Sequence, residues 1–333
     1  MTNPLQIKPG DGGAEESGLP TADVLGGPFV EDGSGTGRAD VGRGGRNVSR
    51  WQLVMRRFRR QKLAMFGLLM LVLLGVGAWV APHLSRWKVD DLDPDFTQAG
   101  SPPTARHWFG SDAIGHDLFV QTMSGLQKSL LVGLVAALLS TLVAAVVGSL
   151  AGYFGKWINT TLMWLVDLLL VIPSFFILAI VSPKLQGKSF LWFAVLLSAF
   201  SWMITSRVVR GMTLSLRERE FVAAARFMGV RPLTIITRHI LPNIASFLIV
   251  DVTLNVGGAI LAETGLSYFG FGVQPPNVSL GTLIATGTAN PGLSQQWLWA
   301  FPGLMLLLIV LAVNFVGDGL RDAIDATSGA GGE

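Results

Sequence analysis

The residues that could perform chemistry in this chain do not form a recognisable catalytic set. The sequence has no cysteine, which excludes disulfides, thiolate metal sites and cysteine nucleophiles. It contains no Gly-x-Ser-x-Gly or His-Glu-x-x-His motif, and no cluster of histidine with carboxylates is apparent. The four histidines all fall outside the long apolar runs: His83, His107, His116 and His239. We therefore expect that the chain is not an enzyme and binds no metal ion or cofactor itself.

One short stretch, Gly187-Lys188-Ser189, matches the end of a phosphate-binding loop. That motif requires a further glycine five residues before Gly187, and this chain has Ser182 there. The stretch also follows an apolar run rather than a strand. We interpret the match as chance.

Three acidic residues lie within or at the end of apolar runs: Asp167, Asp251 and Glu263. A carboxylate at membrane depth is costly and usually faces a bundle interior or a water-filled cavity. One interpretation is a proton relay. The other is that each acid caps or pairs with a helix, and Glu263 comes at a run's end, where it needs little burial. Three scattered acids favour the second interpretation.

The elements that must position these residues are long apolar helices. Half of the 333 residues are hydrophobic and 14% are charged, against about 25% charged in a typical soluble domain. A membrane-spanning helix needs about 20 mostly apolar residues. Six such runs occur, at 63–80, 129–154, 157–181, 189–206, 242–262 and 297–316. The sequence therefore predicts an all-α polytopic membrane protein with six transmembrane helices.

Basic residues are unevenly distributed between the loops. Residues 1–62 hold ten Lys or Arg and residues 207–241 hold seven. Residues 82–127 hold three against six aspartates, and residues 264–296 hold no charge. Because cytoplasmic loops carry the excess of Lys and Arg, we expect both termini and the 207–241 loop to be cytoplasmic.

The segments outside the spans complete the predicted organisation. Residues 1–50 are rich in Gly, Asp, Glu and Ser and are predicted to be a disordered cytoplasmic tail. Residues 51–82 would hold the first span, preceded either by a basic amphipathic helix on the inner membrane surface or by a simple positive-inside signal. Residues 83–127 would be extracytoplasmic, 128–320 a core with five spans, and 321–333 a second cytoplasmic tail.

The cytoplasmic loop contains a predicted short helix over residues 218–228, between the fourth and fifth spans. Its apolar residues recur at helical spacing, at Phe221, Ala224, Ala225 and Met228. Gly229 would end this helix, Pro232 could begin another turn, and Leu241-Pro242 would mark the start of the next span. The apolar stripe is narrow, partly alanine, and rimmed by Glu218, Arg219, Glu220 and Arg226. These features favour docking to a cytoplasmic partner over a helix that lies on the bilayer.

Residues 217–229 read Arg-Glu-Arg-Glu-Phe-Val-Ala-Ala-Ala-Arg-Phe-Met-Gly, and residues 238–243 read Arg-His-Ile-Leu-Pro-Asn. Together they resemble the EAA loop of ABC importer permeases. Two positions depart from that pattern: Ala223 replaces the glutamate of the triplet, and His239 stands where a hydrophobic residue is expected, with Ile240 beside it. The glycine and the Leu-Pro pair keep their spacing.

Further stretches narrow the resemblance. They are His107–Asp117, with the sequence His-Trp-Phe-Gly-Ser-Asp-Ala-Ile-Gly-His-Asp, and Glu263–Pro276, with Glu-Thr-Gly-Leu-Ser-Tyr-Phe-Gly-Phe-Gly-Val-Gln-Pro-Pro. The stretches 302–322 and 56–63 add the last helix and the start of the first span. In this order they resemble the C-type permease of dipeptide and oligopeptide ABC importers, over about residues 51–325.

The resemblance implies a function and partners. The chain would form half of a translocation path for dipeptides or oligopeptides in the bacterial plasma (inner) membrane, as a heterodimer with a second, B-type permease. Two cytoplasmic ATPases would bind ATP and Mg, and a substrate-binding protein would deliver peptide from outside. Lipid would surround the chain, and no nucleic acid is implied. The residues implied in ATPase coupling are Glu218, Glu220, Phe221, Ala223, Ala224, Ala225, Arg226, Met228, Gly229, Leu241 and Pro242.

The uncharged stretch 264–296 is predicted to fold back toward the outer mouth and help form a gate. Irregular backbone is tolerated at membrane depth where protein or a water-lined cavity covers it. The alternative is an ordinary outer loop. The predicted gate and path residues are Ser267, Tyr268, Phe269, Phe271, Gln274 and Pro275.

Other interpretations stay open at this level. A permease of the same branch could serve nickel or a modified peptide such as glutathione, because the motifs are shared. A stand-alone ion-coupled carrier is the alternative from another class, and the docking-type loop and the lack of an acid relay argue against it. The acidic run Asp90, Asp91, Asp93 and Asp95 would be a solvated outer face or a contact for the binding protein.

Overall fold

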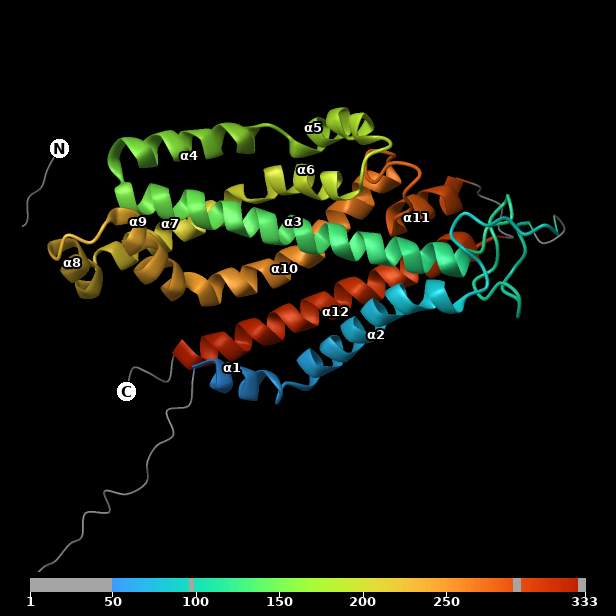
Figure 1. Cartoon of the computed structure of the whole chain (residues 1–333), viewed down its shortest axis with the longest axis horizontal. Coiled ribbons are helices and arrows are strands. Elements are labelled where there is room, and N and C mark those ends of the chain that lie inside the picture. The colour runs from blue at the N-terminus through green and yellow to red at the C-terminus, as the bar shows by residue number, and fades with distance from the viewer. Residues whose placement is uncertain (1–49, 96–98, 290–294, 329–333) are drawn as a thin grey trace, which may run out of the picture. The chain divides into compact units, whose positions relative to one another are not determined.

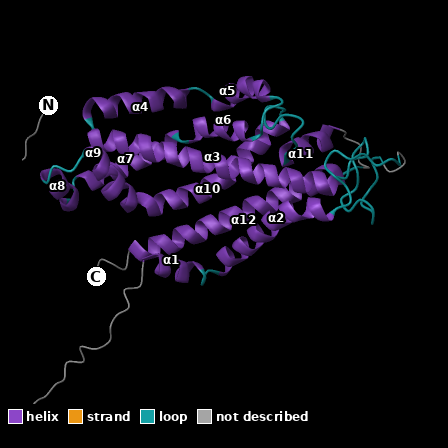
Figure 2. Ribbon diagram, viewed as in Figure 1, coloured by secondary structure: helices purple, strands orange, loops and turns teal. Residues whose placement is uncertain are grey.

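The computed structural model describes residues 50–95, 99–289 and 295–328. The predicted N-terminal tail therefore lies almost entirely outside the described residues. Contacts divide the chain into Met1–Asn47 and Val48–Glu333, and the second unit holds all the elements described here. Within the described ranges its regular elements are helices (Figures 1 and 2). They are α1 (Arg50–Phe58), α2 (Lys62–Leu84), α3 (Leu118–Phe154), α4 (Lys156–Val171), α5 (Ser174–Val181), a 3₁₀ turn (Ser182–Leu185), α6 (Leu191–Ser201), α7 (Met203–Arg217), α8 (Glu220–Phe227), α9 (Pro232–Ile235), a π-helical turn (Ile236–Ile240), α10 (Leu241–Tyr268), α11 (Leu280–Ala289) and α12 (Trp297–Ser328).

Four stretches are long and apolar enough to cross a membrane: α2, α3, Pro232–Tyr268 and Trp297–Asp325. Two further pairs pass the same test together, α4 with α5 and α6 with α7, but they bend by 76° and 50° at their breaks. Counting each bent pair as one span gives up to six spans in the described residues. The prediction of an all-α polytopic membrane protein is confirmed.

The two bends have local causes. Pro173 has no N–H to donate and restricts the residue before it to an extended conformation, so α4 ends at Val171. Between α6 and α7, the Ser201 hydroxyl donates to the Leu197 carbonyl at 2.9 Å, a bond that competes with the helix ladder and bends helices. Beyond the bend, α7 continues to Arg217. Residues 207–217, expected in a loop, are therefore helical.

Two other helices extend beyond the predicted boundaries. The helix of the second span begins at Leu118, before the apolar run at 129, because the Asp117 carboxylate accepts the Val120 N–H at 2.9 Å and caps the helix there. Residues 118–127, expected in the extracytoplasmic segment, are thus its first turns. At the other end of the chain, α12 continues to Ser328, so the predicted tail from residue 321 begins as helix.

Helix α3 is the centre of the fold, with α7 and α10 packed along it (Figure 1). Close approach to α7 depends on two glycines four residues apart, which share one helix face. A Cβ on Gly148 would lie 2.5 Å from the Ser206 carbonyl oxygen, and one on Gly152 would lie 2.7 Å from the Thr213 Cβ. Small residues at such a seam let helix backbones pack closely in a membrane.

The basic segment before the first span forms α1. Its Val54 and Phe58 side chains are buried in a cluster with Ala64 and Ala323, so one face of the helix packs on α12. Arg56 of α1 and Arg59 and Arg60 of the turn after it are exposed, whereas Arg57 is half-buried. The segment is therefore an amphipathic helix whose apolar face contacts protein.

Candidate functional site

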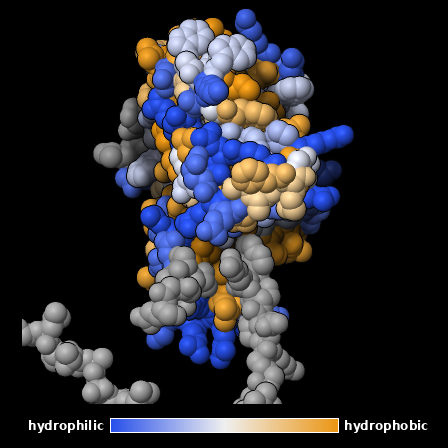
Figure 3. All heavy atoms as spheres, turned by 90° about the vertical axis from the view of Figure 1, so that its left-hand side faces the viewer, coloured by the Kyte–Doolittle hydropathy of each residue, from blue (hydrophilic) through white to orange (hydrophobic). Residues whose placement is uncertain are grey.

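The predicted docking helix forms as α8 at one end of the helices, and residues 85–95, residues 99–117 and α11 lie toward the opposite end (Figure 1). Its outer face is strongly apolar: Phe227 is 92% exposed, Met228 75% and Phe221 42%. Seen toward this end, hydrophilic residues gather over the surface with hydrophobic atoms between them and along the edges (Figure 3). The rim residues Glu218, Arg219, Glu220 and Arg226 are all exposed.

The predicted apolar stripe mixed two faces of α8. Phe221, Ala224 and Met228 are exposed as expected, but Ala225 is 2% exposed and points into the protein. The buried face also includes Val222, and the exposed face includes Phe227, neither of which the sequence analysis singled out. Phe227 follows Ala224 by three residues, and residues at this spacing lie on the same face of a helix. Helical spacing therefore identifies Phe227 as a member of the exposed face.

The buried face of α8 rests on the end of α3. Val222 and Ala225 pack in a cluster with Tyr153, Ile235, Ile236 and Ile240. The Arg226 guanidinium lies 5.9 Å from the centre of the Tyr153 ring. Arg217, which pairs with Glu218 at 3.0 Å, donates to the Tyr153 carbonyl at 3.3 Å. These contacts fix α8 to α3 as well as to the segment that follows it.

Gly229 ends α8 as predicted. Its φ of +74° lies in the left-handed region that favours glycine. Its N–H donates to the Arg226 carbonyl at 3.0 Å, and the Val230 N–H donates to the Ala225 carbonyl at 3.1 Å. This pair of bonds is the Schellman motif, which satisfies carbonyls at a helix end.

Pro232 then begins α9, and the chain continues through the π-helical turn into α10. The helical path is continuous from Pro232 to Tyr268, so the helix begins nine residues before Leu241-Pro242, where we expected the span to start. Pro242 fits at the second position of α10 and is exposed, whereas Leu241 packs against the α8 cluster. A displacement of α8 is thus connected to both α3 and α10.

At the opposite end, Glu263 anchors the loop between α10 and α11. Its carboxylate accepts the Ser129 hydroxyl at 2.8 Å and the Ser267 hydroxyl at 2.6 Å. Ser129 Oγ in turn accepts the Leu280 N–H at 3.3 Å, and Ser267 Oγ accepts the Val273 N–H at 3.1 Å. Glu263 is fully buried, so the expectation that it needs little burial is wrong.

The six predicted gate residues divide into two sets. Ser267 is buried in the Glu263 network, Phe271 packs edge-on to Phe175, and the Gln274 amide donates to Ser182 Oγ at 3.3 Å. These three hold the loop against α10, α5 and the 3₁₀ turn that follows α5. The other three, Tyr268, Phe269 and Pro275, are exposed.

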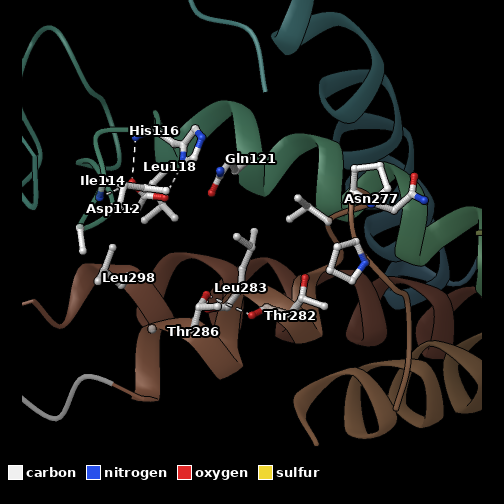
Figure 4. A pocket seen from close by; sticks show the side chains of 15 residues that line it. Asp112, Ile114, His116, Leu118, Gln121, Asn277, Thr282, Leu283, Thr286 and Leu298 are labelled. Atoms are coloured by element: carbon white, nitrogen blue, oxygen red, sulfur yellow. Dashed lines mark hydrogen bonds and ion pairs between the residues drawn. The ribbon is translucent and has the colours of Figure 1, made fainter. Parts of the chain in front are cut away.

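The same loop borders a cavity of about 410 Å³ (Figure 4). Asp112 and His116 lie at one end of the cavity, with Asp112 Oδ2 2.8 Å from His116 Nδ1. Three side chains project from α11 along one side: Thr282, Leu283 and Thr286. Gln121 of α3 and Asn277 of the loop also line the cavity, together with the apolar side chains of Ile114, Leu118 and Leu298. A volume of this size is within the range that holds small molecules or side chains.

The segment between α2 and α3 contains a buried charge cluster. His107 is fully buried, with Nδ1 2.8 Å from Asp117 and Nε2 3.0 Å from Asp93. A neutral imidazole can donate to one of these carboxylates, whereas the imidazolium ring can donate to both. Arg106 also donates to Asp93, at 2.7 Å. The cluster ties the acidic run to the cap of α3.

This cluster corrects two expectations. A histidine–carboxylate cluster does exist, and Asp93 is 2% exposed rather than part of a solvated face. Burial opposes ionisation of Asp93. The Asp95 N–H, the His107 hydrogen bond and the Arg106 charge outweigh that effect and hold the pKa of Asp93 below its usual value. Among the residues that the structure describes, no three His, Cys, Asp or Glu side chains are arranged to hold a metal ion.

Comparison with known families agrees with this architecture. Residues 144–328 match the family described as "Binding-protein-dependent transport system inner membrane component". Residues 49–103 match the "N-terminal TM domain of oligopeptide transport permease C". The chain belongs to the family of binding-protein-dependent inner membrane permeases of ABC transporters.

Individual relatives place it within that family. The "Oligopeptide transport system permease protein OppC" of Mycobacterium tuberculosis is 54% identical over 282 residues, which cover 84% of this chain and 96% of that protein. A "Putative peptide permease protein" of Brucella suis is 39% identical, over 81% of this chain and 88% of that protein. A chain of the MetNI methionine ABC transporter superposes with a TM-score of 0.47 at 21% identity, over 60% of this chain and 94% of that one. The chain is an OppC-type permease.

Proposed function

We propose that this chain is the C-type permease subunit of an ATP-driven importer of oligopeptides, and that it forms half of the translocation path with a second, B-type permease. The oligopeptide substrate is inferred from the relatives, which carry that substrate in their names at up to 54% identity. The chain contributes a path and a coupling surface rather than catalysis. ATP and Mg would be bound by separate ATPase subunits.

The observation that carries the coupling proposal is the exposed apolar face of α8. Phe227 is almost fully exposed beside Phe221 and Met228, within a rim of four charged residues. An apolar patch with a polar rim is typical of a protein–protein contact. In this proposal the face docks on a cytoplasmic ATPase, and the chain's termini lie on the same, cytoplasmic side of the membrane.

The buried side of α8 supplies the mechanical link. When the ATPases close, α8 moves with them as a rigid element. The cluster of Val222 and Ala225 with Tyr153 passes the displacement to α3, and α9 with the π-helical turn passes it to α10. Helices that move together in this way switch access by rigid-body rotation.

At the outer end, we assign the gate to the loop after α10. The loop's two ends are tied to Glu263 through Ser267 and Ser129, which themselves belong to α10 and α3. A movement of α3 relative to α10 therefore reaches the loop directly. A substrate-binding protein would deliver peptide to this side.

Reconstitution tests the proposal. The chain is placed in proteoliposomes with its B-type permease and two ATPases, the binding protein is added outside, and uptake of a radiolabelled tripeptide is followed. We expect uptake that requires ATP and the binding protein. Uptake by the chain alone without ATP would overturn the proposal in favour of a carrier. Uptake of nickel or glutathione in place of peptide would overturn the substrate assignment alone.

A further inference from the structure

The three acids at membrane depth have different surroundings. Asp167 of α4 pairs with Arg207 of α7, so its charge is balanced within the chain. Glu263 is fully buried and holds the outer loop through two serines. Asp251 of α10 is only partly buried and belongs to neither arrangement. Its role is the one that the fold and the coupling mechanism leave unexplained.

The Asp251 carboxylate accepts three hydrogen bonds from neutral groups. Thr141 of α3 donates at 2.7 Å, Thr205 of α7 at 3.0 Å, and the Asn255 amide at 2.9 Å. An ionised carboxylate only accepts hydrogen bonds and has about four lone-pair sites. The three donors therefore suit the charged form and leave room for a further donor. Among the described residues, no Lys, Arg or His pairs with Asp251.

An uncompensated negative charge at this depth is costly. A carboxylate in a membrane protein is normally paired or faces a cavity that carries substrate or ions. A clamp between three helices needs only hydrogen bonds, which a neutral Asn could supply at lower cost. The charge itself therefore indicates a cation that visits the site.

The position of Asp251 on α10 leads to the outer gate. One face of the helix is formed by Asp251 and the residues that follow it at helical spacing: Asn255, Gly258, Ala262, Gly265 and Phe269. Gly258 is exposed, and a Cβ added to Gly258 or Gly265 would meet no atom within 4 Å. At a rise of 1.5 Å per residue, Asp251 lies roughly 27 Å along the helix from Phe269. This face is half-buried at Asp251, where α3 and α7 contact it, and exposed at Gly258 and Ala262. It ends at the exposed gate residue Phe269.

We propose that Asp251 binds the α-ammonium group of a peptide inside the translocation path. This inference rests on the proposed function. The free amino terminus is the one cation that every unmodified peptide carries, whatever its sequence, and an ammonium group has three N–H donors. Asp251 would thus stabilise the passing substrate at membrane depth without selecting its side chains.

The test separates charge from shape in the reconstituted importer. Asp251→Asn keeps the size and most hydrogen bonds but removes the charge, whereas Asp251→Glu keeps the charge and changes the length. We expect Asp251→Asn to lower uptake of trialanine about tenfold, because one charge-assisted hydrogen bond is lost. We expect Asp251→Glu to retain most of the wild-type uptake. Thr205→Val, which removes a donor but no charge, is expected to behave like Asp251→Glu. A helix clamp would give the reverse order, with Asn tolerated and Glu not, and would overturn the inference.

A second comparison uses N-acetyl-trialanine, which has no ammonium group. The ratio of variant to wild-type uptake cancels any preference of the binding protein. We expect Asp251→Asn to leave uptake of this peptide unchanged, and equal losses for both peptides would overturn the inference. If the wild type imports peptide with ATP and Asp251→Asn has no effect, the Asp251 site is overturned and the proposed function is not. Failure of the wild-type complex to import any peptide would overturn the proposed function as well.

Discussion

Ser129 Oγ lies 2.8 Å from Glu263 Oε2, so a hydroxyl on α3 bonds to a fully buried carboxylate on α10. The same oxygen accepts the backbone N–H of Leu280, where α11 begins. One side chain therefore joins two spans and the returning loop. Because these contacts connect α3 and α10 to the loop that follows α10, they carry the gate proposal.

Ser129→Ala should loosen this loop. The substitution leaves the Leu280 N–H and one carboxylate oxygen without their partner, and an unsatisfied buried polar group costs about 1–3 kcal/mol. The chain has no cysteine, so Asn277→Cys provides a single labelling site in the loop. We expect faster reaction of this cysteine with an external maleimide when Ser129→Ala is added. Ser189→Ala, at an exposed position, is the control, and equal rates in both would contradict the anchoring role.

Gly148→Leu should separate α3 from α7. The new side chain would collide with the Ser206 carbonyl, which is backbone and cannot move aside cheaply. Overpacking of this kind typically costs about 1–3 kcal/mol, and we expect a lower melting temperature in detergent and less folded protein in the membrane. Gly211→Leu is the matched control, because a Cβ at Gly211 meets nothing within 4 Å. Equal losses in the two variants would contradict the close packing of these helices.

Acid should weaken the segment between α2 and α3 through Asp93. Its pKa is lower in the folded protein than in the unfolded chain, so its stabilising contribution is present above the ordinary aspartate pKa of about 4. That contribution is lost as the pH falls through the folded pKa. We expect protease cleavage within residues 86–117 to increase sharply below about pH 4. In Asp93→Asn the same increase should already occur at neutral pH. Cleavage that is independent of both changes would show that the cluster does not hold this segment.

Gly229→Val should uncouple α8 from the spans. A β-branched residue at a φ of +74° is strained, by about 1–2 kcal/mol for a left-handed conformation, and it would disturb the turn from α8 into α9. Glu220→Lys changes the charged rim without touching the buried face. We expect both variants to insert into the membrane and to assemble with the second permease, but to lose ATP-driven uptake. Normal uptake in both would count against coupling through α8, and Gly211→Ala serves as the control for a tolerated glycine change.

The spans could be predicted from the sequence because long apolar runs have few other uses. The EAA-type loop could also be placed, since its glycine and its helical spacing act locally. Helix ends differ from the ends of the apolar runs where a single side chain decides them. Asp117 caps α3 earlier than hydropathy indicates, and Pro173 divides the third span.

The sequence analysis missed the buried pairings of His107 and Glu263 for a different reason. His107 finds Asp93 fourteen residues away through a folded loop, and Glu263 is buried because Ser129 and Leu280 come to it from distant parts of the chain. No local pattern contains these pairings. Ala225 was assigned to the wrong face and Phe227 was missed for a simpler reason, since a stripe of four residues on a two-turn helix leaves its register uncertain by one position.

The central claim is that α8 docks on an ATPase, and purification tests it most directly. The tagged chain is extracted from its native membrane in mild detergent, and the proteins that come with it are identified by mass spectrometry. The account predicts a second six-span permease and ATPase subunits with the wild type. With Phe227→Asp it predicts the same permease and at least a tenfold loss of the ATPases, as for a hot spot of about 2 kcal/mol or more. ATPases recovered equally with Phe227→Asp, or a chain that purifies alone and moves solute without ATP, would contradict it.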